Sequence, residues 1–317
     1  MNGPSVGGRP ATGSAQSQGQ RVLSRRGFLA GIACAASFSA PVVGSVRAET
    51  GRNGEAGPIT VYVYPGPVPI HTRVRHGLAG LRSGWTDVHR DATAAVADAF
   101  AQLDAHFEDD LAYTVSPQEP IGARLGASSP LSALTDVEDV LRSFRDTVRE
   151  RDVGAPDSCH LLLWWDAFNY SVGYGHVLDN GHVGDDDEGT YTVANVGATE
   201  LWDSRAVTRN MAIHETIHTF LSDDIVSMVI ESGCDHNLGA AVETAPGVRE
   251  VTPMATAYAG ADEYDSGTRW PGRGCVDHDV FSVHDGTDGV DRWEYTSDLS
   301  DATLEALSLY VREHFLE

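Results

Sequence analysis

The segment 214–218 reads His-Glu-Thr-Ile-His and lies inside a stretch, 205–220, whose apolar residues recur at helical spacing. On an α-helix, residues four apart occupy one face, about 6 Å apart along the axis. His214 and His218 can therefore direct imidazole nitrogens at one ion, while Glu215 lies beside that ion without binding it. The spacing predicts a metal site with a carboxylate next to it.

Zinc is the metal that best explains such a segment. A zinc ion held by three protein ligands keeps a fourth position for water, lowers the pKa of that water towards 7, and lets a neighbouring glutamate act as general base. Amide hydrolysis requires this combination. The apolar surround of the motif supports the same interpretation, because two unligated histidines and a glutamate would be costly to bury there.

Together with residues further along the chain, the motif resembles the metzincin metallopeptidases, whose pattern is His-Glu-x-x-His-x-x-Gly-x-x-His/Asp followed by a methionine turn. His214, Glu215 and His218 match this pattern directly. At unbroken spacing the third ligand would be Asp224, but Leu221 stands at the glycine position. Leucine resists the left-handed backbone that would turn the chain back to the metal.

A second candidate for the third ligand follows an insertion. The segment 233–236, Gly-Cys-Asp-His, restores the Gly-x-x-His step 12 residues late, which is similar to the leishmanolysin branch of the metzincins. A continuous helix would carry His236 about 27 Å from His218, so residues 225–232 must loop back. We expect His236 to be the third ligand, and the alternatives are Asp224 and, as in gluzincin peptidases, Glu231 or Glu243.

The resemblance, which spans residues 205–260, implies two more features. Segment 252–258, Thr-Pro-Met-Ala-Thr-Ala-Tyr, occupies the place of the methionine turn, so Met254 would pack beneath the zinc site. In some metzincins a tyrosine two residues after that methionine contacts the metal or stabilises the oxyanion. Here Thr256 stands at that position, and we expect Tyr258 to be the catalytic tyrosine.

Hydrophobic patterning outside the motif predicts the fold class. We predict an α/β fold of the α+β zincin type in one domain, 58–317, with a mixed twisted sheet, an active-site helix and a C-terminal helix. The stretch between the active-site helix and the C-terminal helix is expected to be irregular. The predicted strands are 59–64, 160–165 and 191–196, and the predicted helices are 92–107, 134–153, 205–220 and 304–315.

Charge composition limits the partners and the environment. Acidic residues number 46 against 22 basic ones, all of them arginine, and the formal net charge is −24. Such a surface repels nucleic acid, so we expect none as a partner. Self-repulsion of this size is screened within a few ångströms at molar salt, which favours a halophilic archaeal host.

The N-terminus carries an export pattern. Segment 24–29, Ser-Arg-Arg-Gly-Phe-Leu, precedes an uncharged apolar run, 30–46, and a small-residue cleavage site at 46–48. We interpret residues 1–48 as a twin-arginine signal peptide with an N-terminal extension, followed by a flexible linker, 49–57. A membrane anchor and lipid attachment at Cys34 are the alternatives. Cleavage would give a secreted protein without stable membrane insertion.

Three cysteines follow the predicted cleavage site. We expect a disulfide between Cys234 and Cys275, which flank Met254, and a packed core thiol at Cys159. The acidic cluster 185–188 has two interpretations, a calcium site or a solvated loop. The predicted cofactors are therefore Zn²⁺ and, at that cluster, Ca²⁺.

The combined prediction is a secreted zinc metallopeptidase that cleaves a peptide or protein substrate, with Glu215 activating the zinc-bound water. The Gly-x-Ser-x-Gly elbow and the phosphate-binding glycine loops are absent from the sequence, which removes common hydrolase and nucleotide-binding alternatives. The rival hypothesis is a secreted or cell-surface module that binds zinc without catalysis. The sequence makes no prediction of the oligomeric state.

Overall fold

The structure of the protein, a computed structural model, describes residues 46–47, 59–69, 72, 84–107, 111–121, 136–153, 157–168, 174–185, 189–260, 272 and 274–316. All of them belong to one compact unit, 43–317. The predicted linker, and the predicted signal segment except Val46–Arg47, lie outside the described residues.

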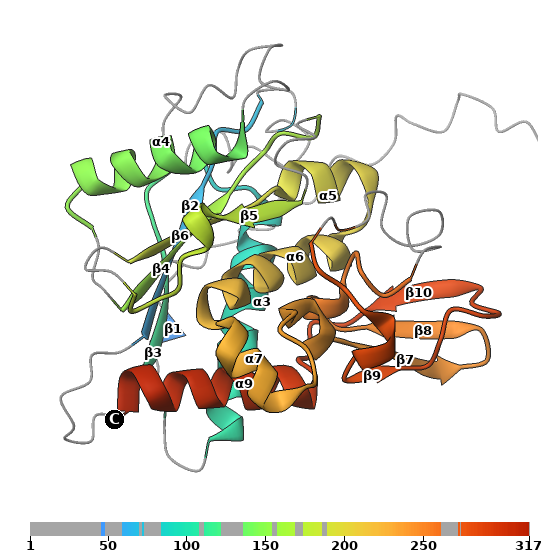
Figure 1. Ribbon diagram of the computed structural model, residues 1–317. Helices are drawn as coiled ribbons and strands as arrows, with labels where there is room; N and C mark the ends of the chain where they lie inside the picture. The colour runs from blue at the N-terminus through green and yellow to red at the C-terminus, as the bar shows by residue number, and fades with distance from the viewer. Residues whose placement is uncertain are drawn as a thin grey trace, which may run out of the picture. The chain divides into compact units, whose positions relative to one another are not determined.

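A six-stranded mixed sheet forms the centre of this unit, in the order β1-β3-β2-β4-β6-β5 (Figure 1). The four inner strands run parallel, whereas β1 and β5 lie antiparallel at the two edges. The strands are β1 (Val46–Arg47), β2 (Ile59–Pro65), β3 (Tyr113–Pro117), β4 (Ser158–Leu163), β5 (Gly175–Val177) and β6 (Thr190–Ala194). The three predicted strands correspond to β2, β4 and β6.

Helices cover both faces of this sheet. Helix α4 (Val137–Glu150) packs on one face, and α3 (Asp87–His106), α6 (Arg205–Ile217) and α9 (Asp301–Val311) pack on the other (Figure 1). Successive side chains of a strand point to opposite faces. Leu161 of β4 therefore joins the core beneath α3 and α6, while its neighbour Leu162 packs against α4. This alternation explains why β4 is buried at every position.

Local capping fixes the helix boundaries. Helix α3 begins five residues before the predicted start at 92, because Thr86 and His89 form a reciprocal capping box at its N-terminus. Ser300 caps the C-terminal helix α9 in the same sense, since its side chain accepts the Thr303 N–H at 3.1 Å.

The prediction of an irregular stretch after residue 220 is wrong. A second sheet lies there in the order β10-β8-β7-β9, with β7 (Ala240–Ala245), β8 (Val248–Val251), β9 (Val283–His284) and β10 (Arg292–Tyr295). Val251 and Trp293 bury their side chains in its own apolar cluster. Two short helices were also not predicted: α5 (Val196–Trp202) and α7 (Asp223–Val229).

Two mixed sheets and six α-helices among the described residues confirm the predicted mixed α/β, or α+β, fold class. The helix predicted around His214 is present as α6 (Arg205–Ile217), and the predicted C-terminal helix is present as α9 (Asp301–Val311). Within the described part of the chain, no helix combines the length and apolar character that a membrane span requires.

Candidate metal centre

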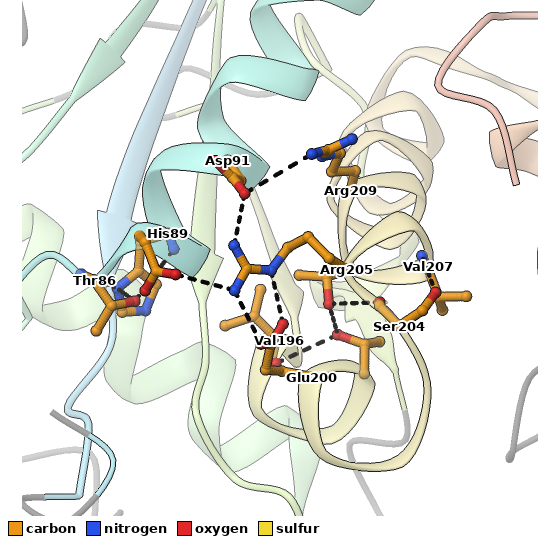
Figure 2. A network of polar contacts seen from close by, with 12 residues as sticks. Thr86, His89, Asp91, Val196, Glu200, Ser204, Arg205, Val207 and Arg209 are labelled. Atoms are coloured by element: carbon orange, nitrogen blue, oxygen red, sulfur yellow. Dashed lines mark hydrogen bonds and ion pairs between the residues drawn. The ribbon is translucent and has the colours of Figure 1, made fainter. Parts of the chain in front are cut away.

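Helix α6 carries the His-Glu-x-x-His motif and is fixed at its N-terminus by charge. Ser204 caps it, and the Arg205 guanidinium binds the carboxylates of Asp91 on α3, at 2.6 Å, and Glu200 on α5, at 2.8 Å (Figure 2). Asp87 accepts a third contact from Arg205 at 3.2 Å. In so acidic a chain, one arginine thus contacts three carboxylates and joins helices α3 and α5 to the motif helix.

Three histidines converge beyond the C-terminal end of α6. His214 lies in the last turn of α6, His218 begins the 3₁₀ turn η4 (His218–Phe220), and His236 lies in η5 (Asp235–Leu238). One ring nitrogen of each lies within 4.8 Å of those of the other two. The Nε2 atoms of His214 and His218 are 2.8 Å apart.

Each of these imidazoles is oriented through its Nδ1 atom. His214 Nδ1 contacts the Pro253 carbonyl oxygen at 2.9 Å, and His236 Nδ1 contacts the Cys275 carbonyl oxygen at 2.6 Å. His218 Nδ1 makes a short contact with the Asp235 carboxylate. Because carbonyl and carboxylate oxygens only accept, each Nδ1 carries a proton, so the Nε2 lone pair of each ring is the one left for a cation when the imidazole is neutral.

The donor set fits a zinc ion. Two ligands of a tetrahedral zinc, each about 2.05 Å from the metal, lie about 3.3 Å apart, close to the Nε2 separation of His214 and His218. Among the described residues, these three imidazoles form a potential metal-binding group with no fourth ligand, and three protein ligands are typical of an open zinc site rather than a closed structural one. Cys234 and Cys275 also lie near His236, but they are joined to each other, with Cα atoms 5.6 Å apart, as predicted.

Burial sets the protonation of the cluster. Burial, followed by repulsion from His218, lowers the pKa of His214 well below its usual value and that of His236 to about 4. Both are therefore neutral, as metal ligands must be. Burial also acts to lower the pKa of His218, but the Asp235 carboxylate outweighs it and raises that pKa. The same attraction holds the pKa of Asp235 well below its usual value, against the effect of burial.

Glu215 is a buried carboxyl group beside the histidines. Its side chain is only 4% exposed, and burial raises its pKa to about 7, while attraction to His218 acts in the opposite direction. Gly175 of β5 lies directly against it, since a Cβ atom on Gly175 would come within 2.3 Å of the Glu215 carboxylate. A carboxyl group with a pKa near neutrality can both take up and release a proton at physiological pH.

Tyr258 packs against the histidine cluster. Its ring stacks on His236 with 3.7 Å between ring centroids, and its hydroxyl oxygen accepts the Gly274 N–H at 3.3 Å. The preceding turn η6 (Pro253–Ala255) contains Met254, which is fully buried, and supplies the carbonyl that orients His214. Of the two residues implied by the metzincin resemblance, Tyr258 thus stacks on His236, and Met254 directly follows the residue whose carbonyl contacts His214.

The alternative third ligands lie elsewhere. Asp224 is exposed in the first turn of α7, Glu231 is exposed after that helix, and Glu243 on β7 binds Arg249 at 2.6 Å. None of the three belongs to a potential metal-binding group among the described residues.

The prediction of a loop at 225–232 is corrected by the structure, in which the chain turns back through helix α7. Leu221 has an extended backbone, with φ −125° and ψ 100°, so it ends the turn η4 without the left-handed conformation. Ser222 then caps α7 through the Ile225 N–H, with Asp223 in the first turn.

Sequence reasoning missed Asp235 and Gly175. The only sequence signal for Asp235 is its position directly before His236. No sequence signal marks Gly175. Of the acidic cluster 185–188, only Asp185 lies within the described residues, and its carboxylate contacts His182 Nδ1 at 3.1 Å. Its calcium role stays a prediction. Cys159 is buried in β4, as expected.

Comparison with known proteins adds no relative. No protein-family model matches the chain, and no curated protein matches it significantly. The functional interpretation therefore rests on the motif residues and on the geometry of the site.

Proposed function

We propose that this protein is a zinc-dependent peptidase. The observation that carries the proposal is the arrangement of three buried or partly buried histidines, each held through Nδ1, beside the buried carboxyl group of Glu215. His214, His218 and His236 would hold the metal through Nε2. When bound, zinc supplies Lewis acidity and lowers the pKa of a coordinated water.

Each protein group then has a role that its environment supports. Glu215 takes the proton of the attacking water on a carboxylate oxygen and delivers it to the nitrogen of the leaving amine. The pKa of about 7 suits both transfers. The Tyr258 hydroxyl, positioned by the Gly274 N–H, donates a hydrogen bond to the carbonyl oxygen of the scissile bond as negative charge develops there. Asp235 keeps the His218 imidazole oriented throughout.

The edge of the large sheet favours an extended peptide as the substrate. Among the described residues, β5 pairs only with β6, so its outer edge has no strand partner. An extended peptide can add to such an edge through main-chain hydrogen bonds. Because Gly175 of β5 contacts Glu215, a peptide along this edge would bring its backbone close to the general base.

We also propose that the protein acts outside the cell. A disulfide between Cys234 and Cys275 persists in an oxidising compartment, which agrees with the twin-arginine pattern. Cleavage after residue 48 would remove β1 and leave β3 at the edge of the sheet. Replacing Arg25 and Arg26 by lysine should abolish export, and unchanged secretion would refute the proposed pathway.

The test of the peptidase activity uses the secreted protein in molar salt. Bound zinc is quantified, and casein cleavage is measured with and without a chelator for the wild type, Glu215→Gln and the exposed control Glu231→Gln. We expect one zinc per chain, chelator-sensitive cleavage, loss of cleavage in Glu215→Gln and normal cleavage in the control. Zinc binding without any cleavage would favour the non-catalytic module, and absence of zinc would refute both.

A further inference from the structure

The disulfide between Cys234 and Cys275 joins two segments that each carry part of the metal centre. Cys234 directly precedes Asp235, which orients His218, and His236. Cys275 supplies the carbonyl oxygen that contacts His236 Nδ1 at 2.6 Å. The disulfide therefore connects the third histidine to the group that orients it.

The segment around Cys275 also packs closely on Tyr258. A Cβ atom on Gly272 would lie 2.1 Å from the Tyr258 ring, and one on Gly274 would lie 2.6 Å from His236 Cε1. The Gly274 N–H donates to the Tyr258 hydroxyl. Only a backbone without side chains fits at both positions, so small movements of this segment displace Tyr258 and His236.

Little apolar packing holds this segment. Residues 274–279 are all exposed and contribute nothing to the buried clusters. Their other contacts are two hydrogen bonds, from the Asp277 N–H to Asn237 Oδ1 at 3.1 Å and between His278 Nε2 and the Tyr258 carbonyl oxygen at 2.8 Å, and the packing of the His278 ring on His284 and Phe281. Exposed segments held by a few hydrogen bonds open readily, whereas a covalent link restricts that opening.

We propose that the Cys234–Cys275 disulfide positions the metal centre: it holds the Cys275 carbonyl against His236 and the Gly274 N–H against Tyr258, so that metal affinity depends on it. This inference rests on the proposed zinc site. Outer groups that orient metal-ligating histidines typically change metal affinity by about 10–100-fold when they are removed.

The test compares the wild type with the double variant Cys234→Ala/Cys275→Ala. Alanine is used rather than reduction, because free thiolates 3.6 and 3.8 Å from His236 Nδ1 would themselves bind zinc. Zinc affinity is measured by chelator competition, the ligand field by the absorption spectrum of the Co²⁺ form, and the metal-free fold by near-UV circular dichroism. We expect a native fold, zinc affinity lower by about 10–100-fold and an altered Co²⁺ spectrum.

A second variant keeps the disulfide and disturbs the same contacts. Gly274→Ala places a methyl group against His236, whereas the control Gly181→Ala places one away from the metal centre, where the nearest atom is 3.5 Å away. We expect weaker zinc binding in the first and normal binding in the control. If the double variant does not fold, Gly274→Ala decides alone.

Wild-type zinc affinity and Co²⁺ spectrum in the folded double variant would overturn the inference, as would normal binding in Gly274→Ala. Either result leaves the proposed function standing, because the wild type still binds zinc. A wild type that binds no zinc would refute the proposed function itself.

Discussion

Glu215→Gln should stabilise the metal-free protein in a pH-dependent way. The pKa of this buried carboxyl group rises from 4.5 to about 7 on folding. Because the pKa is higher in the folded state, the contribution of Glu215 to the free energy of unfolding is fully present below pH 4.5. It is lost as the pH rises through 7. At 1.36 kcal/mol per pKa unit, the wild type should lose about 1 kcal/mol by pH 5 and about 3 kcal/mol by pH 8. Glutamine has no charge to bury and avoids this loss.

The assay is thermal unfolding in molar salt with a chelator at pH 5 and pH 8. The loss of stability in the wild type is about 2 kcal/mol larger at pH 8 than at pH 5. The amount by which the Tm of Glu215→Gln exceeds that of the wild type should therefore be about 4–8 °C larger at pH 8 than at pH 5. The exposed variant Glu231→Gln serves as the control and should show no such difference. An advantage of Glu215→Gln that is equal at both pH values would refute the argument from burial.

Three further variants test the metal centre and its support. His236→Ala should lose bound zinc on dialysis, measured by elemental analysis, whereas Asp224→Ala should keep it; the opposite pattern would reassign the third ligand. Asp235→Asn should weaken zinc binding by about 10–100-fold in chelator competition, because an amide orients its imidazole partner less firmly, and an unchanged affinity would contradict this. Arg205→Ala should lower the free energy of unfolding by about 1–3 kcal/mol, since three carboxylates lose their contact with its guanidinium, whereas Arg142→Ala on the exposed face of α4 should cost under about 1 kcal/mol; equal losses in denaturant titrations would reject the stated role.

The elements that could be predicted from the sequence are those with strong local patterning. The apolar run of β4 and the helical spacing around His214 are each readable within about ten residues. The second sheet is not, because β8 pairs in parallel with β10, aligning Val248 with Arg292. Its strands carry polar residues such as Glu243 and Arg249, whose contacts only the folded chain reveals.

The third histidine shows how far sequence reasoning about the site reaches. His236 is the preferred ligand because the segment 233–236 restores the Gly-x-x-His step, and the structure brings its ring nitrogen close to those of His214 and His218. The chain between His218 and His236 runs through helix α7 with its Ser222 cap, which the predicted loop at 225–232 does not include. Asp235 was also missed, because a carboxylate that orients a ligand leaves no spacing rule in the sequence.

Gly175 limits which substitutions the site can accept as the sequence diverges. Because its missing side chain makes room for the Glu215 carboxylate, the proposed general base and the sheet edge can change only together. A library that randomises residue 175 and selects for casein cleavage should return glycine almost alone. Where position 215 carries a smaller residue, larger residues should become acceptable at 175, so the identity of residue 175 would report whether a related chain has kept its general base.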